Sequence, residues 1–198
     1  MDIVFATNNL HKLEEIAALL GDGFRLIGLK DLNIDEDIPE DHATLEENAS
    51  QKAWYIYEKT GRNCFADDTG LEVHALKGAP GVYSARYSRI GQLTFPEMEA
   101  AEGNIKKLLL EMDGVEKRQA RFRTVIALVL EGREYQFEGV VDGWITETAS
   151  GAKGFGYDPV FRPNGYELTF AEMDLEAKNQ ISHRARAVTE LVQFLKRM

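Results

Sequence analysis

Cysteine is almost absent from this sequence, since Cys64 is the one cysteine in 198 residues. A single cysteine excludes an internal disulfide and a metal cluster held by several thiolates. Cys64 stands in the apolar stretch NCFA, where a thiol behaves as a small hydrophobic side chain. We therefore expect a buried structural thiol rather than a nucleophile.

Long apolar runs are absent as well. No run approaches the roughly 20 apolar residues that a membrane helix needs, and the first residues do not resemble a signal peptide. We therefore expect a cytoplasmic protein that has no membrane partner.

Positive charge is scarce. Lysine and arginine number 23 against 33 acidic residues, which gives a formal net charge of −10. This balance argues against broad binding to a nucleic-acid backbone, which needs many cations on one surface. A small anion held by a few local cations, or by a metal on carboxylates, is still allowed.

Helical and strand patterns alternate along the chain, which predicts a mixed α/β sheet in one domain over residues 1–198. The expected strands cover 3–5, 24–29 and 63–66, and two more flank a turn at Glu131 and Gly132 within 119–145. Four helices are expected. In the first, which ends near Gly21, apolar residues recur with a period of 3.6 residues. The others run from the N-cap Thr44 to Gly61, from the N-cap Thr94 to about Met112, and onward from Ser182.

Two adjacent aspartates, Asp67 and Asp68, follow the strand NCFA. Neighbouring residues of a strand point to opposite faces, so we expect the strand to end at Ala66, before the aspartates. Ligands gather at the carboxyl ends of strands in open α/β sheets. Two close carboxylates repel each other unless a cation or hydrogen-bond donors compensate their charge. Mg²⁺ could be that cation, because it binds through only one or two protein carboxylates. A simple turn at this point is the alternative.

Two further segments offer cations. In ATNNLHK a loop enters a helix whose first N–H groups, with Lys12, could bind phosphate. The alternative is that an asparagine caps the helix and Lys12 is a surface residue. In TLEENASQKA, Asn48 and Lys52 lie four residues apart on one helical face, either in a site or in a polar surface stripe.

The remaining two segments could contact a ligand. GAKGFGYDPVF combines glycines with Phe155 and Tyr157, whose rings offer flat faces for a base, although a glycine-rich turn before a strand explains it as well. In EAKNQISHRARA, His183 and Arg184 stand at a helix start. Cations there oppose the helix dipole, which suggests a role in ligand binding.

Taken in order from Ala6 to Arg184, these segments resemble the Ham1/RdgB family of inosine triphosphate pyrophosphatases. The most specific matches are ADDTGLEV, PGVYSARY, GFGYDP and ISHR. The resemblance implies an elongated mixed sheet whose flanking helices form two lobes around a central cleft, a homodimer and dependence on Mg²⁺. It also implies hydrolysis of the non-canonical purine nucleotides ITP, dITP and XTP to the monophosphate and pyrophosphate.

The same resemblance implies roles for individual residues. Asp68 resembles the catalytic residue and, with Glu40 and Asp67, a metal ligand. Arg184 resembles a nucleotide or base contact, and because arginine can only donate hydrogen bonds, we expect it to bond the 6-oxygen of the base. The implied substrate-binding residues are Thr7, Asn9, Lys12, Lys52, Thr69, Phe155, Tyr157, Asp158, Lys178, His183 and Arg184. A less selective pyrophosphatase or phosphatase, or a nucleotide-binding regulator without catalysis, stays open.

Overall fold

The structure is a computed structural model that describes residues 1–21 and 23–198, and the chain divides into two compact units. Unit 1 comprises Met1–Asp68, Thr124–Val140 and Ser182–Met198, and unit 2 comprises Thr69–Arg123 and Val141–Ile181. The single domain with two lobes around a cleft stays a prediction. None of the helices in the described part of the chain has the length and apolar character of a membrane span.

The strands of the described residues form one seven-stranded sheet in the order β2-β1-β3-β5-β6-β7, with β4 paired to β3. Strand β1 pairs in parallel with β2 and β3, whereas β3–β4 and β6–β7 are antiparallel. This arrangement confirms the predicted mixed α/β sheet. The strands are β1 (Asp2–Phe5), β2 (Arg25–Ile27), β3 (Cys64–Val73), β4 (Pro80–Gly81), β5 (Gln119–Leu130), β6 (Arg133–Ile145) and β7 (Phe161–Pro163).

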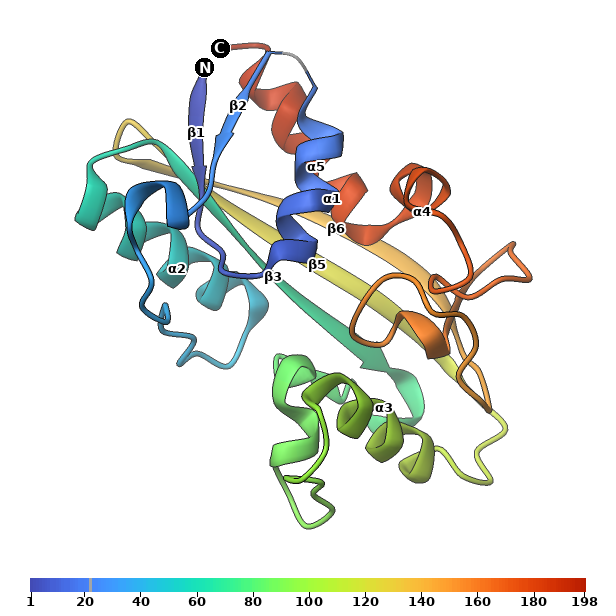
Figure 1. Cartoon of the computed structure of the whole chain (residues 1–198). Coiled ribbons are helices and arrows are strands. Elements are labelled where there is room, and N and C mark those ends of the chain that lie inside the picture. Colours follow the sequence, from blue (N-terminus) through green and yellow to red (C-terminus); the bar gives the residue numbers. More distant parts are fainter. Residues whose placement is uncertain (22) are drawn as a thin grey trace. The chain divides into compact units, whose positions relative to one another are not determined.

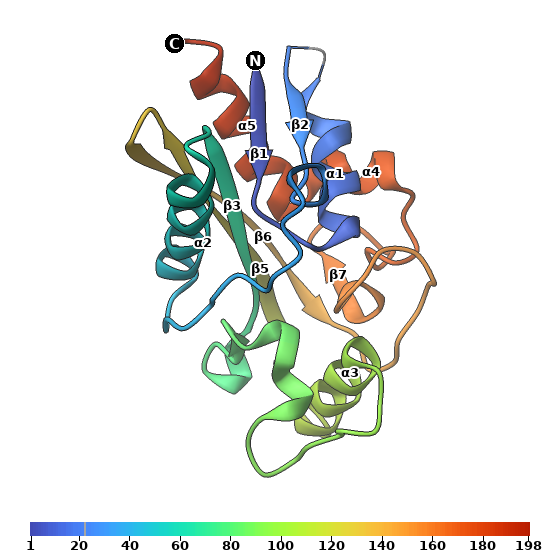
Figure 2. The same cartoon turned by 60° about the vertical axis from the view of Figure 1, so that its left-hand side comes forward.

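The helices of unit 1 cover both faces of its strands. Helices α1 (Leu10–Leu20) and α5 (His183–Leu195) lie beside each other on one face, and α2 (Leu45–Thr60) lies on the other (Figures 1 and 2). Strand alternation explains why both faces are apolar. Phe5 and Phe65 face α1 and α5 and stack at 4.7 Å between ring centroids. Cys64 faces α2.

Cys64 is the buried structural thiol that the sequence predicts. Its Sγ donates to the carbonyl oxygen of Ala53 in α2 at 3.1 Å, and the residue has no exposed surface. Burial raises the pKa of the Cys64 thiol to about 12, so the reactive thiolate is scarce at neutral pH.

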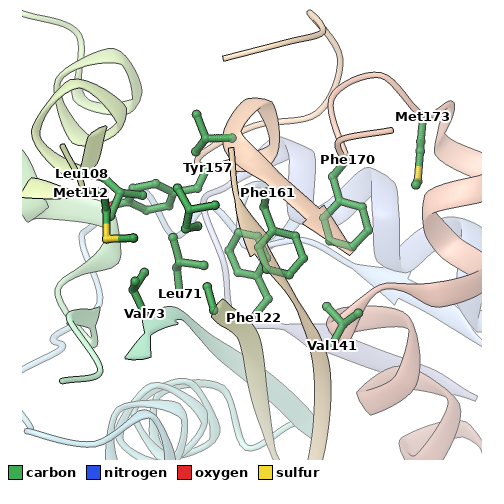
Figure 3. Packing of buried hydrophobic residues seen from close by; sticks show 13 residues of the cluster. Leu71, Val73, Leu108, Met112, Phe122, Val141, Tyr157, Phe161, Phe170 and Met173 are labelled. Carbon is green, nitrogen blue, oxygen red and sulfur yellow. The ribbon is translucent and has the colours of Figure 1, made fainter. Parts of the chain in front are cut away.

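Unit 2 contains helices α3 (Ala100–Glu111) and α4 (Leu175–Ile181) and a core rich in aromatic rings. Phe161 lies between Phe122 and Phe170, with centroid distances of 4.6 and 5.3 Å (Figure 3). Tyr157 belongs to the same core, and its hydroxyl donates to the carbonyl oxygen of Ser84 at 2.9 Å. These contacts fix the loop that precedes β7.

Elements with strong local signals form where predicted. The Thr44 side chain caps α2 through the N–H of Glu47, and left-handed Gly61 ends that helix. Ser182 caps α5 in the same way. The turn between β5 and β6 has positive φ at Glu131 and Gly132, 51° and 75°, as a two-residue hairpin turn requires.

Two predicted boundaries are wrong, and one helix was not predicted. Strand β3 continues through the aspartates to Val73, and α4, just before α5, was not predicted. Helix α3 begins at Ala100 rather than after Thr94. The reason is that residues 94–98 form a turn whose carbonyl groups at Phe95 and Met98 accept hydrogen bonds from Arg89.

Candidate active site

Asp67 and Asp68 lie inside β3, so their side chains point to opposite faces of the strand, and both are buried. The expectation that the strand ends at Ala66 fails because each carboxylate has its own set of charged or polar partners. All of these partners belong to unit 1.

On the face of α1 and α5, Asp67 is held by two cations. Nζ of Lys12 donates to Oδ1 at 2.8 Å, and Nε of Arg184 donates to Oδ2 at 3.2 Å. Nη1 of Arg184 also donates to Glu15, a buried residue of α1. Burial alone would raise the pKa of Asp67, but the charges of Lys12, Arg184 and Lys52 hold that pKa well below its usual range.

On the face of α2, Asp68 lies between an amide and an ammonium group. Nδ2 of Asn48 donates to Oδ2 at 3.3 Å, and Nζ of Lys52 donates to Oδ1 at 3.3 Å. Lys52 also donates to Oε1 of Glu40. Burial raises the pKa of Asp68, and although burial opposes charge on Lys52, the carboxylates of Asp68 and Glu40 raise the pKa of that lysine.

The segment that carries Glu40 is attached to α2 on both sides of the glutamate. Upstream, Glu36 accepts from Tyr55 and Lys59. Downstream, Asp41 and Gln51 exchange two hydrogen bonds at 3.1 and 3.2 Å. This attachment keeps Glu40 next to Lys52.

Two carboxylates, those of Glu40 and Asp68, thus converge on one cationic group. Among residues 1–21 and 23–198, no group of three or more His, Cys, Asp or Glu side chains is arranged to hold a metal. Mg²⁺ needs only one or two protein carboxylates, because waters and substrate phosphates supply its other oxygens. The pair Glu40 and Asp68 fits that donor set.

The loop before α1 shows the capping arrangement. Oδ1 of Asn9 accepts from the N–H of Lys12 at 3.2 Å, and Oγ1 of Thr7 accepts from the N–H of Asn9 at 3.2 Å. The Lys12 side chain is only 15% exposed, so the alternative of a surface lysine is wrong. Asn48 and Lys52 are buried too, which excludes a polar surface stripe.

In unit 2, the loop 151–157 is held by a buried ion pair. Nζ of Lys178 donates to Oδ2 of Asp158 at 2.7 Å and lies 5.0 Å from the ring centroid of Phe155. The same Asp158 oxygen accepts from the N–H of Phe155 at 2.9 Å. Gly154 has φ of +72°, and an added Cβ there would collide with this carboxylate. Phe155 and Lys178 are therefore fixed together.

Three other predicted residues have different surroundings. Thr69 follows Asp68 in β3, in unit 2. Tyr157 is a core residue, so the expectation that its ring offers a face to a base is wrong. His183, the first residue of α5, is buried, and its carbonyl oxygen packs against Gly139 of β6, where an added Cβ would overlap it.

The position of Arg184 at a helix start has a structural explanation. The side chain is 1% exposed and lies between the carboxylates of Glu15 and Asp67, which raise the pKa of the guanidinium against the opposing effect of burial. Two buried anions outweigh the unfavourable helix dipole, which contributes about 0.3–1 kcal/mol. A ligand is therefore not needed to account for this arginine.

The model of the Ham1 family matches residues 3–194. The chain belongs to the Ham1 family. It is 49% identical to the "dITP/XTP pyrophosphatase" of Flavobacterium johnsoniae over 98% of each chain, and 50% identical to that of Porphyromonas gingivalis over 98% of this chain and 96% of the relative.

Solved structures agree with this membership. The Staphylococcus aureus Ham1 protein superposes with a TM-score of 0.85 at 37% identity, covering 99% of this chain and 98% of the other. A HAM1 protein from Coxiella burnetii gives a TM-score of 0.88 at 34% identity over both whole chains. The mixed sheet with flanking helices is thus the fold of Ham1 proteins.

Sequence reasoning on this Ham1-family chain missed one residue of the charged cluster, Glu15, and assigned no partner to another, Asn48. Glu15 falls three residues after Lys12, on the same helical face, and that spacing was a usable signal. Asn48 was noticed for its position beside Lys52, but the sequence does not reveal that its amide reaches Asp68.

Proposed function

We propose that this chain hydrolyses dITP, XTP and ITP to the nucleoside monophosphate and pyrophosphate, removing non-canonical purine nucleotides from the nucleotide pool. One observation carries the proposal: the buried carboxylate of Asp68 lies between Asn48 and Lys52, and Glu40 shares that lysine. The names of the relatives from Flavobacterium johnsoniae and Porphyromonas gingivalis support the choice of substrates.

Attack of water on the α-phosphorus needs a general base and neutralisation of negative charge. Asp68 is the proposed base. Burial raises the pKa of Asp68, and a carboxylate of higher pKa accepts a proton more readily. Lys12 and Lys52 are proposed to place positive charge beside the triphosphate.

Mg²⁺ is the proposed cofactor, with Glu40 and Asp68 as its protein ligands. When bound, it would neutralise phosphate charge and polarise the bond to be broken. The role of Asp67 as a third ligand stays a prediction, and both of its oxygens accept from cations of the protein. We also propose that Asp67 holds Lys12 in place.

Phe155 and Lys178 are the proposed contacts to the nucleoside, with Asp158 fixing both. Phosphate binding by Thr7 and Asn9 and nucleotide contacts by Thr69 and His183 stay predictions. A homodimer and a cytoplasmic location, both expected from the sequence, stay predictions as well. Light scattering of the purified protein would test the first and cell fractionation the second.

The proposal is tested by incubating the protein with dITP, XTP, ITP, ATP and GTP, with Mg²⁺ or with EDTA, in water enriched in ¹⁸O. We expect dIMP and pyrophosphate in equal amounts from dITP, with ¹⁸O in the monophosphate because water attacks the α-phosphorus. EDTA should abolish turnover.

The other candidate activities give different results. A phosphatase would release orthophosphate and the nucleoside diphosphate as first products. A less selective pyrophosphatase would hydrolyse ATP and GTP at rates similar to dITP. A regulator without catalysis would bind nucleotide and release neither product. Any of these results would contradict the proposed function.

A further inference from the structure

The amide of Asn48 joins two parts of the proposed site. Asn48 lies in the second turn of α2 and is 1% exposed. Its Oδ1 accepts from the N–H of His42 at 2.9 Å, and its Nδ2 donates to Oδ2 of Asp68 at 3.3 Å and to the carbonyl oxygen of His42 at 3.4 Å. One side chain therefore contacts both the segment that carries Glu40 and the strand that carries Asp68.

The carboxamide of Asn48 matches the chemistry of these contacts. A backbone N–H can only donate, and an ionised carboxylate can only accept, so the residue between His42 and Asp68 must present one acceptor and one donor. Aspartate has the same shape but would place a second carboxylate against Asp68. Alanine would leave the N–H of His42 and an oxygen of Asp68 without this partner, and buried polar groups are costly to leave unpaired.

Asn48 and Lys52 divide the two oxygens of Asp68 between them. Lys52 donates to Oδ1 and Asn48 to Oδ2, so the carboxylate plane is set by two donors one helical turn apart on α2. Both side chains also contact the segment 40–42. Lys52 forms an ion pair with Glu40, and Asn48 accepts a hydrogen bond from the N–H of His42. Helix α2 thus sets the distance from Glu40 to Asp68.

We propose that Asn48 is a positioning residue for the hydrolysis: its amide holds Asp68 and the Glu40 segment at the spacing that the reaction needs. It does not touch the substrate in this role. The inference rests on the proposed function, because it assigns Asn48 to that same site.

The test compares Asn48→Ala and Asn48→Asp with Ser50→Ala, a control on the same helix whose hydroxyl bonds to Glu134 instead. We expect kcat for dITP to fall at least roughly tenfold in both Asn48 variants, because small displacements of reacting groups are costly. KM should stay within about threefold of wild type, since no substrate contact is removed. Ser50→Ala should keep both constants.

A binding measurement separates positioning from loss of substrate affinity. Calorimetric titration with a dITP analogue that has a methylene group between the α- and β-phosphorus should give nearly unchanged affinity for Asn48→Ala. The concentration of Mg²⁺ needed for half-maximal binding should rise. A folded variant with wild-type kcat, or one that loses only affinity for the analogue, would overturn the positioning role.

A double-mutant cycle in thermal unfolding tests the contact itself without any catalysis. If Asn48 and Asp68 interact, the shifts in Tm of Asn48→Ala and Asp68→Ala should not add in the double variant. Additive shifts would overturn the inference. If Asn48→Ala does not fold, the cycle is measured with Asn48→Asp, because aspartate keeps the shape of the side chain and the hydrogen bond from the N–H of His42. Wild-type protein that releases no pyrophosphate from dITP would overturn the proposed function, and the role of Asn48 in it, even where the cycle shows coupling.

Discussion

Arg184 and Asp67 form an ion pair at 3.2 Å between Nε and Oδ2, and each side chain is 1% exposed. The same guanidinium binds Glu15 of α1, and the same carboxylate binds Lys12. The start of α5, the inner face of α1 and strand β3 are thus joined by four alternating charges. Removing any one of them takes at least one ionic partner from a buried charge, which is more costly than losing a surface ion pair.

Replacing Arg184 by alanine should destabilise unit 1. It leaves the carboxylates of Glu15 and Asp67 buried without this cation, and such losses cost about 3–5 kcal/mol. Urea unfolding gives the free energy directly. Arg186→Ala is the matched control, because Arg186 is exposed and donates to the neutral carbonyl oxygen of Val140. Equal effects of the two substitutions would contradict the structural role.

The same variant tests the predicted contact of Arg184 with the base. If the arginine bonds the 6-oxygen, the ratio of kcat/KM for ITP over ATP should fall sharply, since an unpaired polar group can supply large discrimination. If Arg184 acts only through Asp67, activity should fall for both nucleotides together. An unchanged ratio, measured at a temperature where the variant is folded, would contradict the predicted contact of Arg184 with the base.

Asp67 should make the free energy of unfolding depend on pH. Its folded pKa lies below the ordinary value of 3.8, so the unfolded chain binds the proton more tightly. The stabilisation is complete above about pH 5 and disappears as the pH falls through the ordinary value toward the lower folded pKa. The stability difference between wild type and Asp67→Asn, from urea unfolding, should therefore shrink on acidification. A difference that is constant from neutral to acidic pH would contradict this.

Asp68→Asn should abolish turnover and keep the fold. Burial raises the pKa of Asp68, which means that its ionised form is disfavoured in the folded state, and a neutral amide avoids that penalty. Loss of a general base lowers kcat roughly 10²–10⁴-fold. Circular dichroism and Tm should match or exceed wild type. A folded variant that releases pyrophosphate at the wild-type rate would show that the base is another group.

Gly154→Ala should weaken nucleotide binding, because the added methyl group displaces the Asp158 carboxylate that fixes Phe155 and Lys178. Gly156→Ala is the control. Gly156 also has positive φ, +62°, but has nothing within 4 Å of an added Cβ. Both variants carry the left-handed strain of about 1–2 kcal/mol. We expect KM for dITP to be clearly higher in Gly154→Ala than in Gly156→Ala. Equal KM values in the two variants would contradict the proposed role of the Asp158 carboxylate in nucleotide binding.

The sequence predicted the elements whose signals are local. The capping box at Thr44, the cap at Ser182 and the turn at Glu131 each depend on residues within a few positions. The end of β3 was predicted wrongly because a buried carboxylate in a strand depends on distant partners. Asp67 is paired with Lys12 and Arg184, which lie 55 and 117 residues away in the sequence.

Much of the candidate site was named from the resemblance rather than from the residues. Local patterns left Lys12 and Lys52 as possible surface residues, and only the structure shows that both are buried against aspartates. Tyr157 shows the opposite error. A tyrosine in a glycine-rich loop gives no local sign that its ring packs into a core with Phe161.

The continuity of β3 makes its residue count as important as its composition. Because side chains alternate along a strand, deleting or inserting one residue between Cys64 and Asp67 would turn every later side chain to the other face. The carboxylate now facing Arg184 would then face Asn48, and the one beside Lys52 would move to α1. A substitution changes the contacts of one side chain, whereas an insertion or deletion of one residue exchanges the partners of both aspartates at once. This stretch of the gene should therefore accept amino-acid exchanges more readily than changes of length.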